Sequence, residues 1–228
     1  MTVRREPRTH GCLMVAVRAG FRRRTAMTDT TVDGQTGGGE SPSGQAAIGS
    51  ITLVCGCMFS GKTTELLRSA ERLPAERVQA FKPAIDTRYA LDAVVSHAGR
   101  AFPATVVDSA AAIPPRIRTS VSLAAIDEGH FFGVELVEVV QGLARCGIDV
   151  VVAALDRDSW GREFPAMRRW VDVADTVTGL SAVCARCGRE ATRTQRLTPI
   201  LDRSMVGGPE SYEPRCEGCW KAPPEAPP

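Results

Sequence analysis

The sequence predicts an α/β fold, in which a mostly parallel, doubly wound sheet is followed by a small C-terminal domain. Three observations predict it. From Ser50 onward, short apolar runs of strand length alternate with amphipathic helical segments, and buried strands separated by helices are typical of parallel sheets. A glycine-rich turn joins the first strand to the first helix. After Leu180 the sequence becomes rich in Cys, Arg, Gly and Pro, which indicates a second, smaller domain.

The expected elements follow in order over residues 49–182. Residues 51–55 form an apolar, β-branched run, and residues 63–73 carry leucines and an alanine at helical spacing. An amphipathic helix is expected over 134–145, ended by Gly147. The further strands are expected at 78–81, 105–107, 121–126 and 148–155.

Composition and charge exclude several classes of protein. A chain of 228 residues with 43% hydrophobic residues can support one ordinary core and an appendage. No apolar run reaches the roughly 18 residues needed to cross a bilayer, so we expect no contact with a membrane. The net charge of only +2 argues against nucleic-acid binding, which needs on the order of 6 to 10 clustered basic contacts.

Both ends of the chain are expected to be disordered. Residues 1–48 begin with scattered arginines and continue with Gly, Ser, Thr and Gln, which offer little to bury. A targeting peptide, or a true start at Met27, are the alternatives for this segment. Residues 221–228 are dominated by proline and are also expected to be disordered.

The strongest motif is the glycine-rich loop from Gly56 to Thr63, which matches G-x-x-x-x-G-K-[ST] without a mismatch. Its amide groups face an anion, Lys62 can reach the phosphates, and the Thr63 hydroxyl can bind Mg²⁺. The motif therefore predicts a P-loop NTPase-like domain. The expected nucleotide-binding residues are Gly56, Met58, Phe59, Ser60, Gly61, Lys62, Thr63 and Thr64.

An acidic pair follows the strand expected at 121–126. Asp127, at the strand end, is where P-loop proteins hold Mg²⁺, usually through water. Glu128 can either orient an attacking water, as in an ATPase, or accept a proton from a substrate hydroxyl, as in a kinase. His130 is expected to serve in packing or polar contacts, while Phe131 and Phe132 either line a flat pocket or belong to the core.

Two C-x-x-C pairs lie in the C-terminal domain, which is expected over 183–220. Four thiolates at this spacing predict a closed, tetrahedral structural Zn²⁺ site that holds a long loop at its base. Two disulfides and a nucleic-acid-binding ribbon are the alternatives. The expected ligands are Cys184, Cys187, Cys216 and Cys219.

Together, several blocks closely resemble the zinc-containing thymidine kinases of animal cytosol and many bacteria. The resemblance covers about three quarters of the chain, from about Ile51 to Trp220. The blocks are the glycine-rich loop through Leu66, Lys82 to Tyr89, Ser96-His97, Asp127 to Phe132, Ala153 to Asp156 and the two cysteine pairs.

This resemblance implies transfer of the γ-phosphoryl group of ATP to the 5′-hydroxyl of thymidine, with deoxyuridine as a second substrate. Lys62 would hold the phosphates, Thr63 and Asp127 would serve Mg²⁺, and Glu128 would be the general base. Arg88 would approach the transferred group, although it could also be a surface arginine paired with Asp86. The family is often tetrameric, and its members imply a cytoplasmic location.

The resemblance also implies that the zinc-tethered loop encloses the nucleoside and reads the thymine ring with its backbone. The implied substrate-binding residues are Met58, Phe131, Thr194, Val206, Gly207, Gly208 and Tyr212. Two departures concern the pocket wall: Ser159 and then Trp160 stand where the family has a phenylalanine, and His130 replaces a common glutamine.

Two other functions are weighed against the kinase. A nucleic-acid-stimulated ATPase would use the cysteine domain to grip DNA, and its ATP consumption would rise with DNA and ignore thymidine. A silent nucleotide-binding scaffold would bind ATP and transfer nothing. The near-neutral charge and the absence of a basic face argue against the ATPase, and the intact Lys62, Thr63, Asp127 and Glu128 argue against the silent scaffold.

Overall fold

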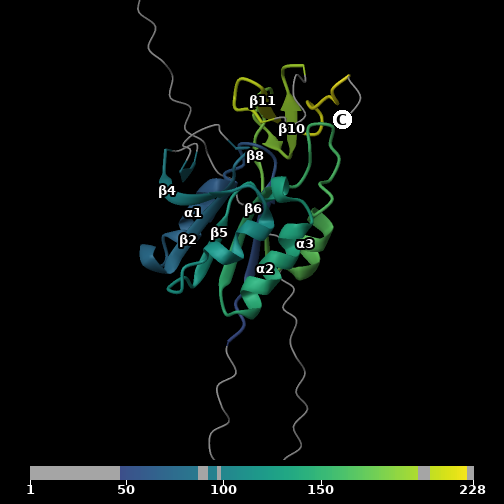
Figure 1. Ribbon diagram of the computed structural model, residues 1–228. Coiled ribbons are helices and arrows are strands. Elements are labelled where there is room, and N and C mark those ends of the chain that lie inside the picture. The colour runs from purple at the N-terminus through teal and green to yellow at the C-terminus, as the bar shows by residue number, and fades with distance from the viewer. Residues whose placement is uncertain (1–46, 87–91, 97–98, 200–205, 225–228) are drawn as a thin grey trace, which may run out of the picture.

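The computed structural model describes residues 47–86, 92–96, 99–199 and 206–224 (Figure 1). The expectations for most of the N-terminal tail, for Arg88 and for residues 225–228 lie outside these ranges. Within the described part of the chain, no helix is long and apolar enough to cross a membrane.

The centre of the molecule is a seven-stranded sheet with the order β3-β4-β2-β5-β6-β1-β7. All neighbouring strands in it run parallel except β3 and β4, which pair antiparallel. This confirms the predicted α/β class. The strands are β1 (Ile51–Gly56), β2 (Val78–Pro83), β3 (Ala93–Val95), β4 (Ala101–Val107), β5 (Leu123–Ile126), β6 (Asp149–Leu155) and β7 (Thr176–Leu180).

Three α-helices pack on the sheet, namely α1 (Lys62–Ala70), α2 (Glu135–Arg145) and α3 (Met167–Val173). Helix α1 ends before the predicted residue 73, because Pro74 disfavours helical geometry in the residue before it. Short 3₁₀ helices lie at Ala75–Arg77, Ala110–Ala112, Pro114–Arg116 and Gly129–Phe132.

The two faces of the sheet are covered by different helices. Successive strand residues point to opposite faces, so Val151 packs with α1 while Val152 packs with α2 and α3. Figure 1 follows this division, with α1 on one side of the strands and α2 and α3 on the other. Because both faces of the sheet are buried at its centre, β5 and β6 are apolar almost throughout.

Residues 182–221, which we call the cysteine module, contain four short strands. β8 (Ala182–Val183) pairs antiparallel with β9 (Glu190–Ala191), and β10 (Arg193–Arg196) pairs antiparallel with β11 (Tyr212–Arg215). Figure 1 shows the β10–β11 hairpin above the sheet. The expected disorder is wrong for Lys221, because the side-chain amide of Gln195 bonds both its backbone N–H and its carbonyl.

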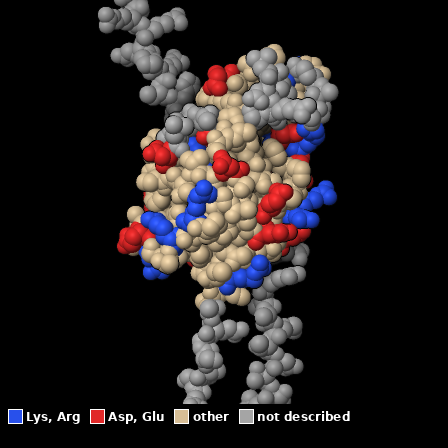
Figure 2. Space-filling model, in the orientation of Figure 1, with Lys and Arg blue, Asp and Glu red and all other residues tan. Residues whose placement is uncertain are grey.

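Charged side chains of both signs are interspersed on the face drawn in Figure 2. Acidic groups lie among the Lys and Arg side chains there, and no broad basic stripe crosses the described residues of this face. A surface that tracks phosphates along nucleic acid needs clustered positive charge. On the described residues of this face, positive charge is therefore dispersed rather than clustered.

Candidate active site

The glycine-rich loop lies at the carboxyl end of β1, which is flanked by β6 and β7. A Cβ on Gly56 would lie 2.1 Å from the Leu180 carbonyl oxygen, and Gly56 has φ +148°, so no larger residue fits there. Gly61 precedes α1 with φ +88°. Phe59 also has a positive φ of 64°, which is uncommon for a residue with a side chain.

The side chain of Lys62 folds back over the loop. Its ammonium group donates a hydrogen bond of 2.7 Å to the carbonyl of Cys57, and the residue is buried. A buried ammonium group needs such a partner because an unpaired charge is costly away from water. The lysine charge is therefore held at the loop, next to the first turn of α1.

The predicted magnesium residues meet across the sheet. The Thr63 hydroxyl lies 3.3 Å from Oδ1 and 3.2 Å from Oδ2 of Asp127, which stands just beyond the end of β5. Burial raises the pKa of Asp127 to about 7, and the neighbouring Glu128 carboxylate adds to the rise. Together the carboxylate and the hydroxyl offer oxygen ligands that suit a hard divalent cation, whose charge would favour the ionised form of Asp127.

Glu128 begins a 3₁₀ turn in a strained backbone conformation, with φ 51° and ψ 39°. Left-handed geometry costs about 1 kcal/mol or more for a residue with a side chain. Its Oε2 lies 3.6 Å from Nδ1 of His130, and that nitrogen accepts a hydrogen bond of 3.3 Å from the backbone N–H of Leu155. The Glu128 carboxylate lies close enough to Asp127 for its charge to raise the pKa of that residue.

His130 is engaged in the packing and polar contacts that the sequence analysis predicts for it. Its ring centroid lies 4.3 Å from that of Phe131 and 4.8 Å from that of Phe164. Phe132 is buried in the core cluster beneath α2, whereas Phe131 is half-buried. Phe132 therefore belongs to the core, which is one of the two alternatives predicted for these aromatic residues.

A buried ion pair lies close to the acidic residues. Lys82 Nζ is 3.5 Å from Oδ2 of Asp86, and both side chains are almost fully buried. The charge of Asp86 also contributes to the raised pKa of Asp127. Lys82 and Asp86 belong to one of the blocks that carry the resemblance. No local pattern predicts that they are buried together, so neither was expected in the site.

The cysteine module touches the glycine-rich loop at two points. The Met58 backbone N–H donates to Oγ1 of Thr194 over 3.1 Å, and both groups are buried. The Cys57 thiol donates to the carbonyl of Ala191 over 3.3 Å. Thr194 and Met58 are both predicted substrate-binding residues, and they are 136 positions apart in the sequence. The fold brings them into direct contact.

The other predicted nucleoside residues lie along the β10–β11 hairpin and its loop. Tyr212 is buried and pairs with Arg196 across the hairpin. Gly207 and Gly208 are buried, and a Cβ on Gly207 would come within 2.8 Å of the Ser211 side chain. Val206 is half-buried beside them. Gly207 therefore packs closely against the side chains of Ser211 and Tyr212.

The segment after β6 carries one of the two departures from the family pattern, Ser159 followed by Trp160. Ser159 is buried, and its hydroxyl has no hydrogen-bond partner among the described residues. Two guanidinium groups lie over the Trp160 ring. The ring centroid is 4.9 Å from Cζ of Arg196 and 5.5 Å from Cζ of Arg162. Trp160 thus attaches this segment to β10 through cation–π contacts.

The four predicted metal ligands converge. One ligand atom from each lies within 4.8 Å of the other three, close to the spacing of about 3.8 Å between sulfurs around a tetrahedral zinc ion. None of the cysteines in the described ranges forms a disulfide. The four ligand residues are Cys184, Cys187, Cys216 and Cys219.

The electrostatics of this cluster favour a cation. A hydrogen bond from Arg189 lowers the pKa of Cys187 to about 6, whereas contact with Cys216 and then Cys187 raises the pKa of Cys219 to about 11. One nearby arginine cannot stabilise four thiolates at once. The cluster fits a divalent cation that binds sulfur, as Zn²⁺ does.

Two features of the site were missed in the sequence. Trp220 follows the second cysteine pair, and its indole N–H donates to the carbonyl of Thr194. Cys57, which the motif treats as a variable position, joins the loop to Ala191. The only available signal was the aromatic residue directly after Cys219; no local pattern distinguishes Cys57 from any other residue in the loop.

Comparisons with known proteins agree with this geometry. A family model described as thymidine kinase matches residues 49–220. A thymidine kinase from Rhodothermus sp. is 44% identical over 179 residues, which cover 78% of this chain and 84% of the relative. Thymidine kinases from Roseiflexus castenholzii and from another Roseiflexus strain are each 43% identical over 187 residues, covering 76% of this chain and 95% of each relative.

Proposed function

Because the chain belongs to the thymidine kinase family, we propose that it transfers the γ-phosphoryl group of ATP to the 5′-hydroxyl of thymidine. The observation that carries this proposal is the meeting of Thr63 with Asp127, next to Glu128 and the phosphate-binding loop. Phosphoryl transfer needs these groups together, because its catalysis is mainly positioning and charge stabilisation.

In this proposal, Lys62 and the loop amides bind the ATP phosphates. Thr63 and Asp127 hold Mg²⁺, which would neutralise charge on the phosphates when bound. Glu128 accepts the proton of the 5′-hydroxyl, and its strained backbone fixes the direction of the carboxylate. Arg88 keeps the role that the resemblance implies for it, beside the transferred group.

The nucleoside would bind between the loop and the cysteine module. Met58 and Phe131 would form walls, and Thr194 would lie near the ring of the base. The hydrogen bond between Met58 and Thr194 supports this assignment, because it joins a residue of the glycine-rich loop to a residue of the cysteine module. The loop from Val206 to Gly208 and Tyr212 would close over thymidine or deoxyuridine.

We further propose that Zn²⁺ occupies the four-cysteine cluster in a structural role. Four sulfur ligands fill a tetrahedral site, so no position stays open for chemistry. Ordering a long loop costs conformational entropy, and a metal clamp at its base lowers that cost before substrate arrives. We also propose domain boundaries at 49–182 and 183–220, which rest on the change in composition after Leu180. A cytoplasmic location and a homotetramer are proposed from the resemblance.

A single assay tests the proposed activity. The purified chain is incubated with Mg²⁺, labelled ATP and each deoxynucleoside in turn, and the products are identified by mass. We expect thymidine monophosphate as the main product and a smaller yield from deoxyuridine. ATP hydrolysis that rises with added DNA and ignores thymidine would instead identify a nucleic-acid-stimulated ATPase.

A further inference from the structure

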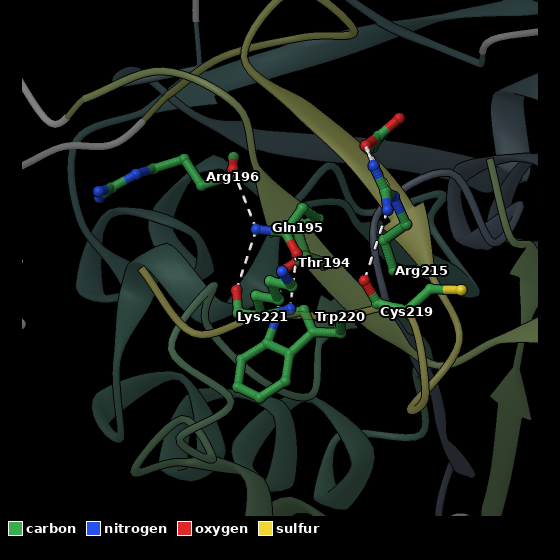
Figure 3. A network of polar contacts seen from close by, with 8 residues as sticks. Thr194, Gln195, Arg196, Arg215, Cys219, Trp220 and Lys221 are labelled. Carbon is green, nitrogen blue, oxygen red and sulfur yellow. Dashed lines mark hydrogen bonds and ion pairs between the residues drawn. The ribbon is translucent and has the colours of Figure 1, made fainter. Parts of the chain in front are cut away.

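Trp220 lies where three segments of the site meet. It directly follows Cys219, and its indole N–H donates a hydrogen bond of 3.2 Å to the carbonyl of Thr194 on β10 (Figure 3). A Cβ on Gly161, in the segment after β6, would lie 3.2 Å from the indole ring. The side chain thus touches both β10 and the segment after β6, and it is attached to the cysteine cluster by one peptide bond.

Thr194 is held from two sides. Its carbonyl accepts from Trp220, and its hydroxyl accepts from the backbone N–H of Met58 in the phosphate loop. The loop and the last turn of the cysteine module are therefore joined through one threonine. Movement of β10 away from Trp220 would also loosen the contact with Met58.

The backbone around Trp220 is itself fixed. Gln195 uses its side-chain amide to bond both the N–H and the carbonyl of Lys221, in the manner of a neighbouring strand (Figure 3). Arg215 donates to the carbonyl of Cys219 over 3.4 Å. The indole is therefore anchored on both sides in sequence and can act as a rigid support.

We propose that Trp220 is a positioning residue for nucleoside binding, which holds β10 so that the Thr194 hydroxyl stays on the amide of Met58. This rests on the proposed function, because Thr194 and Met58 are the residues assigned to the nucleoside. Trp220 contacts neither the phosphates nor the acidic pair in this proposal, so its effect falls on nucleoside affinity rather than on phosphoryl transfer.

The test is Trp220→Phe, which keeps an aromatic ring and removes the N–H donor. We expect the KM for thymidine to rise about fivefold to tenfold, in the range of one partly buried hydrogen bond. The kcat and the KM for ATP should stay within about twofold of wild type, and the zinc content should be unchanged. Calorimetric binding of thymidine should weaken by the same factor as KM.

Two further variants distinguish positioning from general loosening. Glu190→Gln changes an exposed carboxylate on β9 of the same module, and it should leave the KM for thymidine unchanged. Thr194→Val should raise that KM, and adding Trp220→Phe to it should have little further effect. An unchanged KM in Trp220→Phe, an equal rise in Glu190→Gln, or additive effects in the double variant would each overturn the assignment.

A measurement independent of turnover separates this inference from the proposed function. Amide hydrogen exchange of the peptide that contains Met58 should accelerate in Trp220→Phe and not in Glu190→Gln. If wild type ignores thymidine while this exchange pattern holds, the proposed substrate is wrong and the structural coupling stands. If thymidine is phosphorylated and the exchange is unaltered, the coupling is wrong and the function stands.

Discussion

The hydroxyl oxygen of Thr63 lies 3.2 Å from Oδ2 of Asp127, although the two residues are 64 positions apart in the chain. The contact exists because β1 and β5 both end at the same edge of the parallel sheet, with β6 between them. One residue follows the phosphate loop and the other follows an apolar strand. Two oxygen donors are thereby brought together at the point where a nucleotide-bound cation would lie.

The titration of Asp127 should make stability depend on pH. Its pKa is about 7 in the folded protein against an ordinary value of 3.8, so the folded state holds a proton that the unfolded chain releases. Protonation therefore stabilises the fold, and this contribution is lost as the pH rises from about 4 through 7, by about 1.4 kcal/mol per pKa unit.

The matched variant for this prediction is Asp127→Asn, which cannot titrate. Urea unfolding from pH 5 to pH 8 without added magnesium should give wild type a steeper loss of stability than the variant. Parallel curves for the two proteins would show that Asp127 has an ordinary pKa. Added magnesium and ATP should reduce the difference, because the ionised carboxylate then gains a partner.

Replacing the proposed general base should separate binding from chemistry. Glu128→Gln is expected to lower kcat by about a hundredfold or more while the affinities for ATP and thymidine stay close to wild type. Steady-state kinetics and equilibrium binding measure the two effects. The exposed Glu138→Gln on α2 is the control and should leave both unchanged; wild-type turnover in Glu128→Gln would refute the role of the carboxylate.

Loss of one metal ligand should loosen the whole cysteine module. Cys219→Ser is expected to lower the zinc content from one ion per chain, reduce the thermal midpoint and raise the KM for thymidine by tenfold or more. Elemental analysis, calorimetry and kinetics follow the three effects. Cys146→Ser changes an exposed thiol outside the cluster and should alter none of them. Full zinc content in Cys219→Ser would exclude this residue as a ligand.

Two glycine substitutions should have opposite effects on the stability of the fold. Gly56→Ala forces a Cβ against the carbonyl of Leu180 and should destabilise the fold and abolish nucleotide binding. Gly142→Ala lies within α2 with open space around the new methyl group, and it should stabilise the fold by about 0.5–1 kcal/mol. Chemical unfolding of both variants tests the pair. A tolerated Gly56→Ala would mean that the loop can move away from β7.

The sequence predicts those parts of the fold whose signals are local. β1 with its loop, β5 with Asp127, and α2 with Gly147 each carry their pattern within a dozen residues. The edge strand β7 was missed because its residues are at most half-buried, so it lacks an apolar run. α3 was missed because its seven residues are too few to establish a helical period.

The site was predictable in its residue types and not in its contacts. The loop, the acidic pair and the cysteine pairs are motifs whose chemistry can be read one at a time. The contact between Met58 and Thr194 joins residues 136 positions apart and depends on how the cysteine module docks on the sheet. The same dependence hides the role of Trp220, because a hydrogen bond to a carbonyl leaves no mark in the sequence.

The thiol of Cys57 has a practical consequence for work with this protein. Burial raises its pKa to about 11, so at neutral pH almost none of it is the thiolate that reacts with electrophiles or oxidants. When zinc occupies the four-cysteine cluster, alkylating reagents should therefore modify the exposed Cys146 ahead of Cys57 and spare the glycine-rich loop. A fluorescent maleimide could accordingly be attached at Cys146 to follow substrate binding in an enzyme that remains active, provided that the metal cluster is kept loaded.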